Sequence, residues 1–184
     1  MKRLGIALGI LSFVMSFASS AFCQEKPDKV SLCEITRDPS AYNHKLLEVT
    51  GLVAHGFEVF NFFDPICPSS PTIWLEYGGK SKSGTTYCCG VTPDRHRLKE
   101  LVVENIPIPL VKDDQFLKFD KLIQPPFPPG KSGVTVHATL VGRFFAGQEM
   151  QTRNGTFWGG YGHLGCCSLF AIQQVKSESP EERK

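Results

Sequence analysis

The stretch KLLEVTGLV, residues 45–53, decides the fold because its residues alternate between two faces. Leu47, Val49, Gly51 and Val53 share one face, and such a period of two is typical of a β-strand. Gly51 in the middle of the strand favours a bend or bulge, as in a strand of a strongly coiled barrel. The stretch therefore predicts a mainly β protein.

Further stretches along the chain also have strand character. Val134, Val136, Ala138 and Leu140 alternate with polar or exposed positions and mark the clearest of them. The expected additional strands cover residues 58–63, 72–77, 134–145 and 166–175, with a short edge strand at residues 87–91. The count is five or six strands, with Gly-rich connections at residues 78–85 and 147–165.

Three helices are expected. Ser31 and Glu34 form the sequence pattern of a capping box, which predicts a short helix that ends at Asp38-Pro39. The segment TPDRHRLKELVVEN, residues 92–105, has Thr92 as its cap and apolar side chains at helical spacing. A further short helix is expected at residues 113–123.

These elements favour one small barrel. We expect a five- to six-stranded OB-like barrel with a helical insertion between the third and fourth strands, as in the OB fold. An Ig-like sandwich is the alternative, although it needs about seven strands and rarely contains a helix of this length.

The pattern of residues 33–51, CEI…DP…YNHKLLEVTG, together with Cys67 and the GYGHLG stretch at residues 160–165, resembles a group of uncharacterised exported bacterial proteins. That group is similar to OB-fold proteins, so the resemblance implies an OB-like domain. It covers residues 33–77 and 134–175 and implies no catalytic residues. The chain departs from the pattern at Asn43-His44, where a tighter turn is expected, and in its additional cysteines.

The N-terminus has the three parts of a secretory signal. Lys2 and Arg3 precede an apolar run at residues 4–17 and small residues at 19–21, which predicts a signal peptide at residues 1–23. A retained N-terminal anchor is the alternative. We expect a secreted or periplasmic protein with no transmembrane segment after cleavage. Residues 24–175 would form a single domain, and the charged residues 176–184 a disordered tail.

The charge balance argues against a nucleic-acid partner. The chain has 20 Lys+Arg and 18 Asp+Glu, and removal of residues 1–23 takes away two basic residues, leaving 18 of each. Binding to phosphate backbones depends on clustered lysine and arginine, and no such cluster is seen.

Cysteine chemistry follows from export. Cys23 lies in the signal, so six of the seven cysteines remain: Cys33, Cys67, Cys88, Cys89, Cys166 and Cys167. Disulfides are expected in an oxidising compartment. Adjacent Cα atoms lie about 3.8 Å apart, below the usual disulfide range. We therefore expect the members of each adjacent pair to have different partners, with at least one bridge between the two pairs.

A metal or redox site is the alternative use of these cysteines. His163 and Cys166 have a ligand-like spacing, and Cys88, Cys89 or His96 could complete a zinc site. A thiol-redox role is also open, although the chain has no Cys-x-x-Cys motif.

No catalytic motif is found, neither Gly-x-Ser-x-Gly nor His-Glu-x-x-His. We therefore expect a non-catalytic exported domain, without a cofactor, that binds a peptide, a glycan or an envelope partner. Its strand face and the Gly-rich loop at residues 155–165 would form the site, with Trp158, Tyr161 and His163 as ligand-binding candidates. The phenylalanines at positions 57, 60, 62 and 63 are expected in the core.

Overall fold

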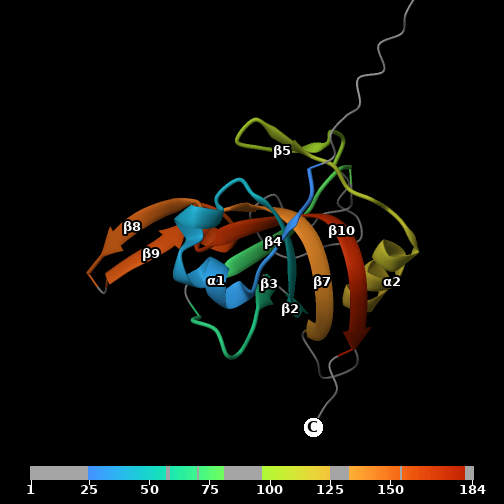
Figure 1. Cartoon of the computed structure of the whole chain (residues 1–184), viewed down its shortest axis with the longest axis horizontal. Helices are drawn as coiled ribbons and strands as arrows, with labels where there is room; N and C mark the ends of the chain where they lie inside the picture. The colour runs from blue at the N-terminus through green and yellow to red at the C-terminus, as the bar shows by residue number, and fades with distance from the viewer. Residues whose placement is uncertain are drawn as a thin grey trace, which may run out of the picture.

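A computed structural model describes residues 25–56, 59–69, 71–80, 97–124, 133–153 and 155–180 (Figure 1). The protein is mainly β, as predicted, and is organised around one mixed six-stranded sheet. The sheet consists of β1 (Asp28–Lys29), β2 (Leu46–Gly56), β3 (Val59–Phe63), β4 (Ile73–Tyr77), β10 (Ser168–Pro180) and β7 (Gly133–Phe145).

The strand pairings close into a ring. The strand order is β1-β2-β3-β4-β10-β7, and β7 pairs with β2 as well as with β10. β2 and β7 run antiparallel from the pair Leu46↔Arg143 to the pair Gly56↔Gly133, whereas β10 and β4 run parallel. The sheet is therefore continuous from β2 around to β7, unlike the two packed sheets of the Ig-like alternative.

Gly51 has a packing role in β2. A Cβ atom at this position would lie 2.3 Å from Leu32 Cδ1, closer than real Cβ atoms approach, and 3.0 Å from Phe62 Cε2, a very tight contact. The glycine thus leaves room for the first helix to pack against the strand. Gly142 of β7 likewise leaves room for a neighbouring side chain, that of Phe170 in β10, whose Cε1 would lie 2.4 Å from an added Cβ.

Aromatic side chains fill the interior. Phe60 and Phe62 are each 2% exposed, and their rings contact Tyr77 and Phe170 with centroids 5.6 Å apart in both pairs. The predicted core position is therefore confirmed for Phe60 and Phe62. Phe63 is 38% exposed, and Phe57 lies outside the described residues.

Two predicted helices are confirmed. α1 (Leu32–Arg37) begins with the expected capping box, in which Ser31 Oγ accepts from Glu34 N–H and the Glu34 carboxylate accepts from Ser31 N–H. α2 (Asp114–Ile123) is capped by Asp113 and buries Phe116, Phe119 and Ile123. A 3₁₀ turn, η1 (Pro39–Tyr42), connects α1 to β2.

The prediction of a helix at residues 92–105 is wrong. Residues 92–96 lie outside the described residues, and the following segment forms a hairpin of β5 (Leu101–Val103) and β6 (Ile106–Ile108). Glu104 and Asn105 at its tip have φ of 49° and 65°, the left-handed conformations that a tight hairpin turn requires. Leu98, expected on an apolar stripe, is 90% exposed.

The Gly-rich segment at residues 147–165 also contains structure. β8 (Gln148–Thr152) and β9 (Gly155–Gly159) form a hairpin that extends from the sheet, at the left of Figure 1. A 3₁₀ turn, η2 (His163–Gly165), follows it. Tyr161 and Cys167 then form an isolated antiparallel bridge that leads into β10.

The prediction of a disordered tail at residues 176–184 is wrong for residues 176–180. β10 continues to Pro180, and Ser177–Pro180 pair with β7 between Thr139 and Val136. Backbone pairing with the long strand β7 orders this segment without an apolar anchor. Residues 181–184 and the predicted signal at residues 1–23 lie outside the described residues, among which no helix is long and apolar enough to cross a membrane.

Candidate functional site

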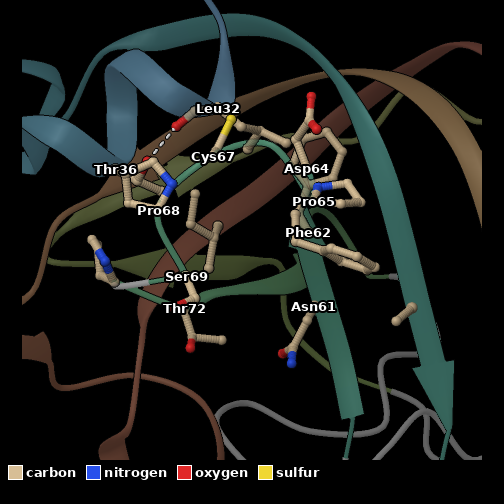
Figure 2. Close-up of a pocket in the computed structure, with 14 residues that line it drawn as sticks. Leu32, Thr36, Asn61, Phe62, Asp64, Pro65, Cys67, Pro68, Ser69 and Thr72 are labelled. Carbon is tan, nitrogen blue, oxygen red and sulfur yellow. Dashed lines mark hydrogen bonds between the residues drawn. The ribbon is translucent and has the colours of Figure 1, made fainter.

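A pocket of about 330 Å³ lies beneath α1, between β3 and the loop that leads to β4 (Figure 2). Most of the residues around it are apolar or carry uncharged polar groups. The described residues that line it are Leu32, Thr36, Ala54, Asn61, Phe62, Phe63, Asp64, Pro65, Cys67, Pro68, Ser69, Pro71, Thr72 and Ile73. Ligand pockets in proteins have volumes of about 300–1,000 Å³, so this one has the size for a small ligand or one large side chain.

A disulfide holds the two walls of the pocket together. Cys33 of α1 is bonded to Cys67 of the loop, with 4.7 Å between the Cα atoms. Asp64 shapes the beginning of the loop, because its Oδ1 accepts from Ile66 N–H at 3.1 Å and its carbonyl oxygen accepts from Cys67 N–H at 3.0 Å. The pocket is thus built by a helix and a loop that are distant in sequence.

The polar groups of the pocket are few. Thr36 Oγ1 donates to the Leu32 carbonyl oxygen at 2.9 Å, drawn as a dashed line in Figure 2. Asn61 Oδ1 is buried and has no hydrogen-bond partner among the described residues. Asp64 is the one charged side chain among the described lining residues. The pocket therefore suits an apolar ligand that carries hydrogen-bond donors.

A larger hollow of about 610 Å³ lies beside the N-terminal segment and the β5–β6 hairpin. Charged side chains line it, but Arg143 is engaged there by the protein itself. Its guanidinium contacts Glu25 at 2.5 Å and donates to the His44 carbonyl oxygen. Because charged side chains line this hollow and Arg143 is already paired with Glu25, it is the weaker candidate.

The predicted ligand-binding residues lie elsewhere. Trp158 on β9 and His163 in η2 are half-buried, and Tyr161 is 8% exposed. None of the three lines the pocket beneath α1. Their predicted role in binding stays a prediction.

Tyr161 belongs to a polar cluster that the sequence did not suggest. Its hydroxyl donates to Glu104 Oε1, and Glu104 Oε2 lies 2.6 Å from His44 Nε2. Burial alone would raise the pKa of Glu104, but the hydrogen bonds from Tyr161 and His44 outweigh burial and hold that pKa below its usual value. The cluster ties the β5–β6 hairpin to the Gly-rich loop. In sequence, Glu104 is 57 positions from Tyr161 and 60 positions from His44, so no local sequence pattern marks the cluster.

Glu76 and His55 are buried titratable groups that lie outside the pocket. Glu76 is 2% exposed, and its Oε1 accepts from Arg97 Nη2 at 2.7 Å. Burial raises the pKa of Glu76 to about 8, although Arg97 acts in the opposite direction. His55 is also 2% exposed, with Nδ1 2.5 Å from the Ile123 carbonyl oxygen, and burial lowers its pKa.

The expected pairing of the adjacent cysteines is wrong for Cys166 and Cys167. The structure joins these two to each other, so neither is bonded to Cys88 or Cys89, which lie outside the described residues. Cys166 has φ −65° and ψ −19° in the turn after η2. The pair therefore precedes the extended strand, in which neighbouring side chains would face opposite ways.

The zinc alternative loses one of its expected ligands. Zinc binds the cysteine thiolate, and Cys166 is oxidised here. Within the described ranges, no three His, Cys, Asp or Glu side chains gather in a way that could hold a metal ion.

Comparison of the chain with models of protein families, with curated proteins and with solved structures gives no match. The function must therefore be argued from the chain's own geometry.

Proposed function

We propose that this protein is an exported, non-catalytic OB-like domain that binds a ligand in the pocket beneath α1. The pocket itself is the observation that carries the proposal. It is preformed, mostly apolar and fastened by the Cys33–Cys67 disulfide. Preformed pockets with a few polar groups are typical binding sites.

The topology supports an OB-like barrel. Five strands close the ring, namely β2, β3, β4, β10 and β7. α2 falls in the chain between β4 and β7, the third and fourth of these strands in sequence. OB folds bind their ligands on the face of their second and third strands. Here β3 and β4 hold those positions, and both contribute to the pocket.

Export is supported by the Cys33–Cys67 disulfide and by the predicted signal at residues 1–23. Disulfides persist in oxidising compartments and are rare in the cytosol. A secreted or periplasmic location would supply peptides, glycans and envelope components as ligands.

The test is a binding screen with the mature protein, prepared with its disulfides intact. Thermal unfolding is followed with peptides, oligosaccharides and small apolar molecules. A ligand at about 100 times its Kd should add about 2.7 kcal/mol to the free energy of unfolding. Phe63→Ala, in the pocket wall, should lower the affinity for that ligand. Leu117→Ala, at an exposed apolar position of α2, should leave the affinity unchanged.

Two outcomes would contradict the proposal. In one, no compound class stabilises the protein. In the other, a bound compound is converted to product, which would make the domain an enzyme.

A thiol-redox protein is the second candidate, and the Cys166–Cys167 disulfide favours it. Cys166 is exposed, so the thiolate of an external dithiol could attack its sulfur and release Cys167 as a thiolate. The second thiol of the dithiol would then displace Cys166, leaving two protein thiols and an oxidised reagent.

The check is titration with a dithiol redox buffer, with mass-spectrometric counting of labelled Cys166 and Cys167. A redox role requires this pair to be reduced reversibly at potentials where Cys33–Cys67 remains bonded. Reduction of both disulfides at the same potential would contradict the thiol-redox function.

A further inference from the structure

We propose that the pocket beneath α1 holds an apolar side chain of an extended peptide that carries a lysine or arginine beside it. This inference rests on the proposed binding function and specifies its ligand. Four features of the pocket support it: its volume, the chemistry of its walls, its single charge and the apolar surface around its mouth.

The volume limits what can enter. About 330 Å³ corresponds to the liquid volume of about ten water molecules. That space accommodates one large apolar side chain with part of its backbone. It is small for several sugar rings, so an oligosaccharide would have to lie mainly outside the pocket.

The walls favour a ligand with hydrogen-bond donors. Pro65, Pro68 and Pro71 have no backbone N–H, so at these positions the loop offers only carbonyl oxygens. Asn61 adds an amide whose Oδ1 lacks a partner among the described residues. A peptide supplies the complementary groups, since its backbone N–H donates on either side of an apolar side chain.

The charge of the pocket excludes anions. Asp64 is the charged residue among those described in the lining, and no lysine, arginine or histidine lies beside it there. Phosphate, carboxylate and nucleic-acid ligands would meet a like charge with no counter-charge. A lysine or arginine of the ligand would instead be attracted to Asp64.

Apolar surface continues beyond the mouth. Phe63 in the wall is 38% exposed, and Ile66, on the same loop, is 86% exposed. A molecule that filled only the pocket would leave this surface in water. A peptide with one anchored side chain could cover it with the neighbouring residues.

The structure also limits the cost of binding. The Cys33–Cys67 bond and the hydrogen bonds of Asp64 hold α1 and the loop in place before a ligand arrives. Preorganised sites lose less conformational entropy on binding.

The test uses short acetylated, fluorescently labelled peptides, with leucine, phenylalanine or serine at the centre and lysine or glutamate on both sides. Binding is measured by fluorescence polarisation at low and high salt. We expect the lysine-flanked leucine and phenylalanine peptides to bind at least tenfold more tightly than their serine or glutamate counterparts. Affinity should fall as salt screens Asp64.

Two variants locate the site. Asp64→Asn keeps the oxygen that accepts from Ile66 N–H but removes the charge, so the preference for lysine over glutamate should fall at least threefold. Asp28→Asn, an exposed acid on β1 outside the pocket, is the matched control and should change nothing. Ser69→Phe places a ring at an exposed loop position of the pocket and should abolish binding.

Folding must be verified separately. Thermal unfolding and an intact Cys33–Cys67 bond are required of each variant. If Ser69→Phe fails this check, Thr36→Phe blocks the pocket from the helix side and replaces it.

The outcomes separate this inference from the proposed function. If an uncharged apolar molecule such as octanol, or an oligosaccharide, binds and no peptide does, the inference of a peptide ligand is wrong. The proposed function as a ligand-binding domain would then still stand. Peptide binding that Ser69→Phe and Asp64→Asn leave unchanged would overturn the site. If none of these probes binds, both the ligand and the proposed function fail.

Discussion

At the scale of single residues, the hydroxyl of Tyr161 makes a bond that can be tested alone. Tyr161→Phe removes the donor to Glu104 and leaves the ring in place. Hydrogen bonds to charged groups contribute about 1.5–3 kcal/mol, and the Glu104 side chain is 43% exposed to screening solvent, so we expect a loss near the lower value. Urea unfolding measures it. Tyr42→Phe is the control, and equal effects for the two variants would contradict this account.

Glu76 predicts a pH dependence of stability. Its folded-state pKa of about 8 lies above the usual 4.5, so the folded protein binds a proton that the unfolded chain has released. Stability from this group is present at low pH and is lost as pH rises toward 8. The slope is at most about 1.4 kcal/mol per pH unit.

The measurement compares wild type with Glu76→Gln between pH 6.5 and 8. His55 acts in the opposite direction at lower pH, because its lowered pKa means that stability falls as pH falls below 6.5. Above pH 6.5 it is mainly neutral in both states. Wild type should lose stability across the window while the variant stays nearly level. Parallel curves would show that Glu76 is ionised throughout.

At the scale of elements, the Cys33–Cys67 disulfide should be the main covalent contribution to stability. The cysteines are 34 residues apart, and closing such a loop stabilises by about 4 kcal/mol on the chain-entropy model. The double variant Cys33→Ser/Cys67→Ser should lose up to this amount in chemical denaturation.

Cys166→Ser/Cys167→Ser is the matched control. These cysteines are 1 residue apart, so their bond closes no loop of the unfolded chain. A larger loss from this pair than from Cys33 and Cys67 would contradict the entropic account.

The end of β10 makes a second prediction at this scale. Deletion of residues 176–184 removes the pairs of Ser177–Pro180 with β7. With net contributions of about 0.5–1.5 kcal/mol per hydrogen bond, we expect a loss of about 2 kcal/mol. Deletion of residues 181–184 alone should have no effect. Equal stability of the two truncated proteins would mean that this part of the strand adds nothing.

Local patterns predicted some elements and missed others for physical reasons. The alternation of residues 45–53 and the Ser31–Glu34 box are signals within a few residues, and both are confirmed. Leu101 and Val102 fit the spacing of a helix, and they fit neighbouring positions of a hairpin strand equally well. The spacing of apolar residues could therefore not decide between a helix and a strand. The left-handed turn at Glu104 and Asn105 is supported by contacts with distant residues.

The candidate site depended even more on the tertiary structure. Leu32 lies far in sequence from Asn61 and Thr72, and the three meet only because the helix packs against β3 and the loop. The sequence identified Cys33 and Cys67 as disulfide candidates, but 15 pairings are possible for six cysteines and only the fold selects this one.

At the scale of the whole molecule, β2 and β7 should be the most protected strands. Every strand of the ring has two neighbours, but β2 and β7 share an unbroken pairing from Leu46↔Arg143 to Gly56↔Gly133, whereas the pairing of β10 with β7 has register shifts. Hydrogen exchange should be slowest at their shared pairs, which include Val49↔Leu140 and Val53↔Val136. The β8–β9 hairpin should exchange much faster. Similar rates in the hairpin and in β2 would show that the ring is not the stable unit.

The position of β10 has a consequence for how the chain is made. It is the last strand in the described sequence, yet it fills the place between β4 and β7. Until residues 168–180 leave the ribosome, β4 and β7 each lack a neighbour, and the ring stays open. A nascent chain therefore cannot close the ring before translation has passed β10. Until then the open ring exposes two strand edges, which a holding chaperone would have to cover.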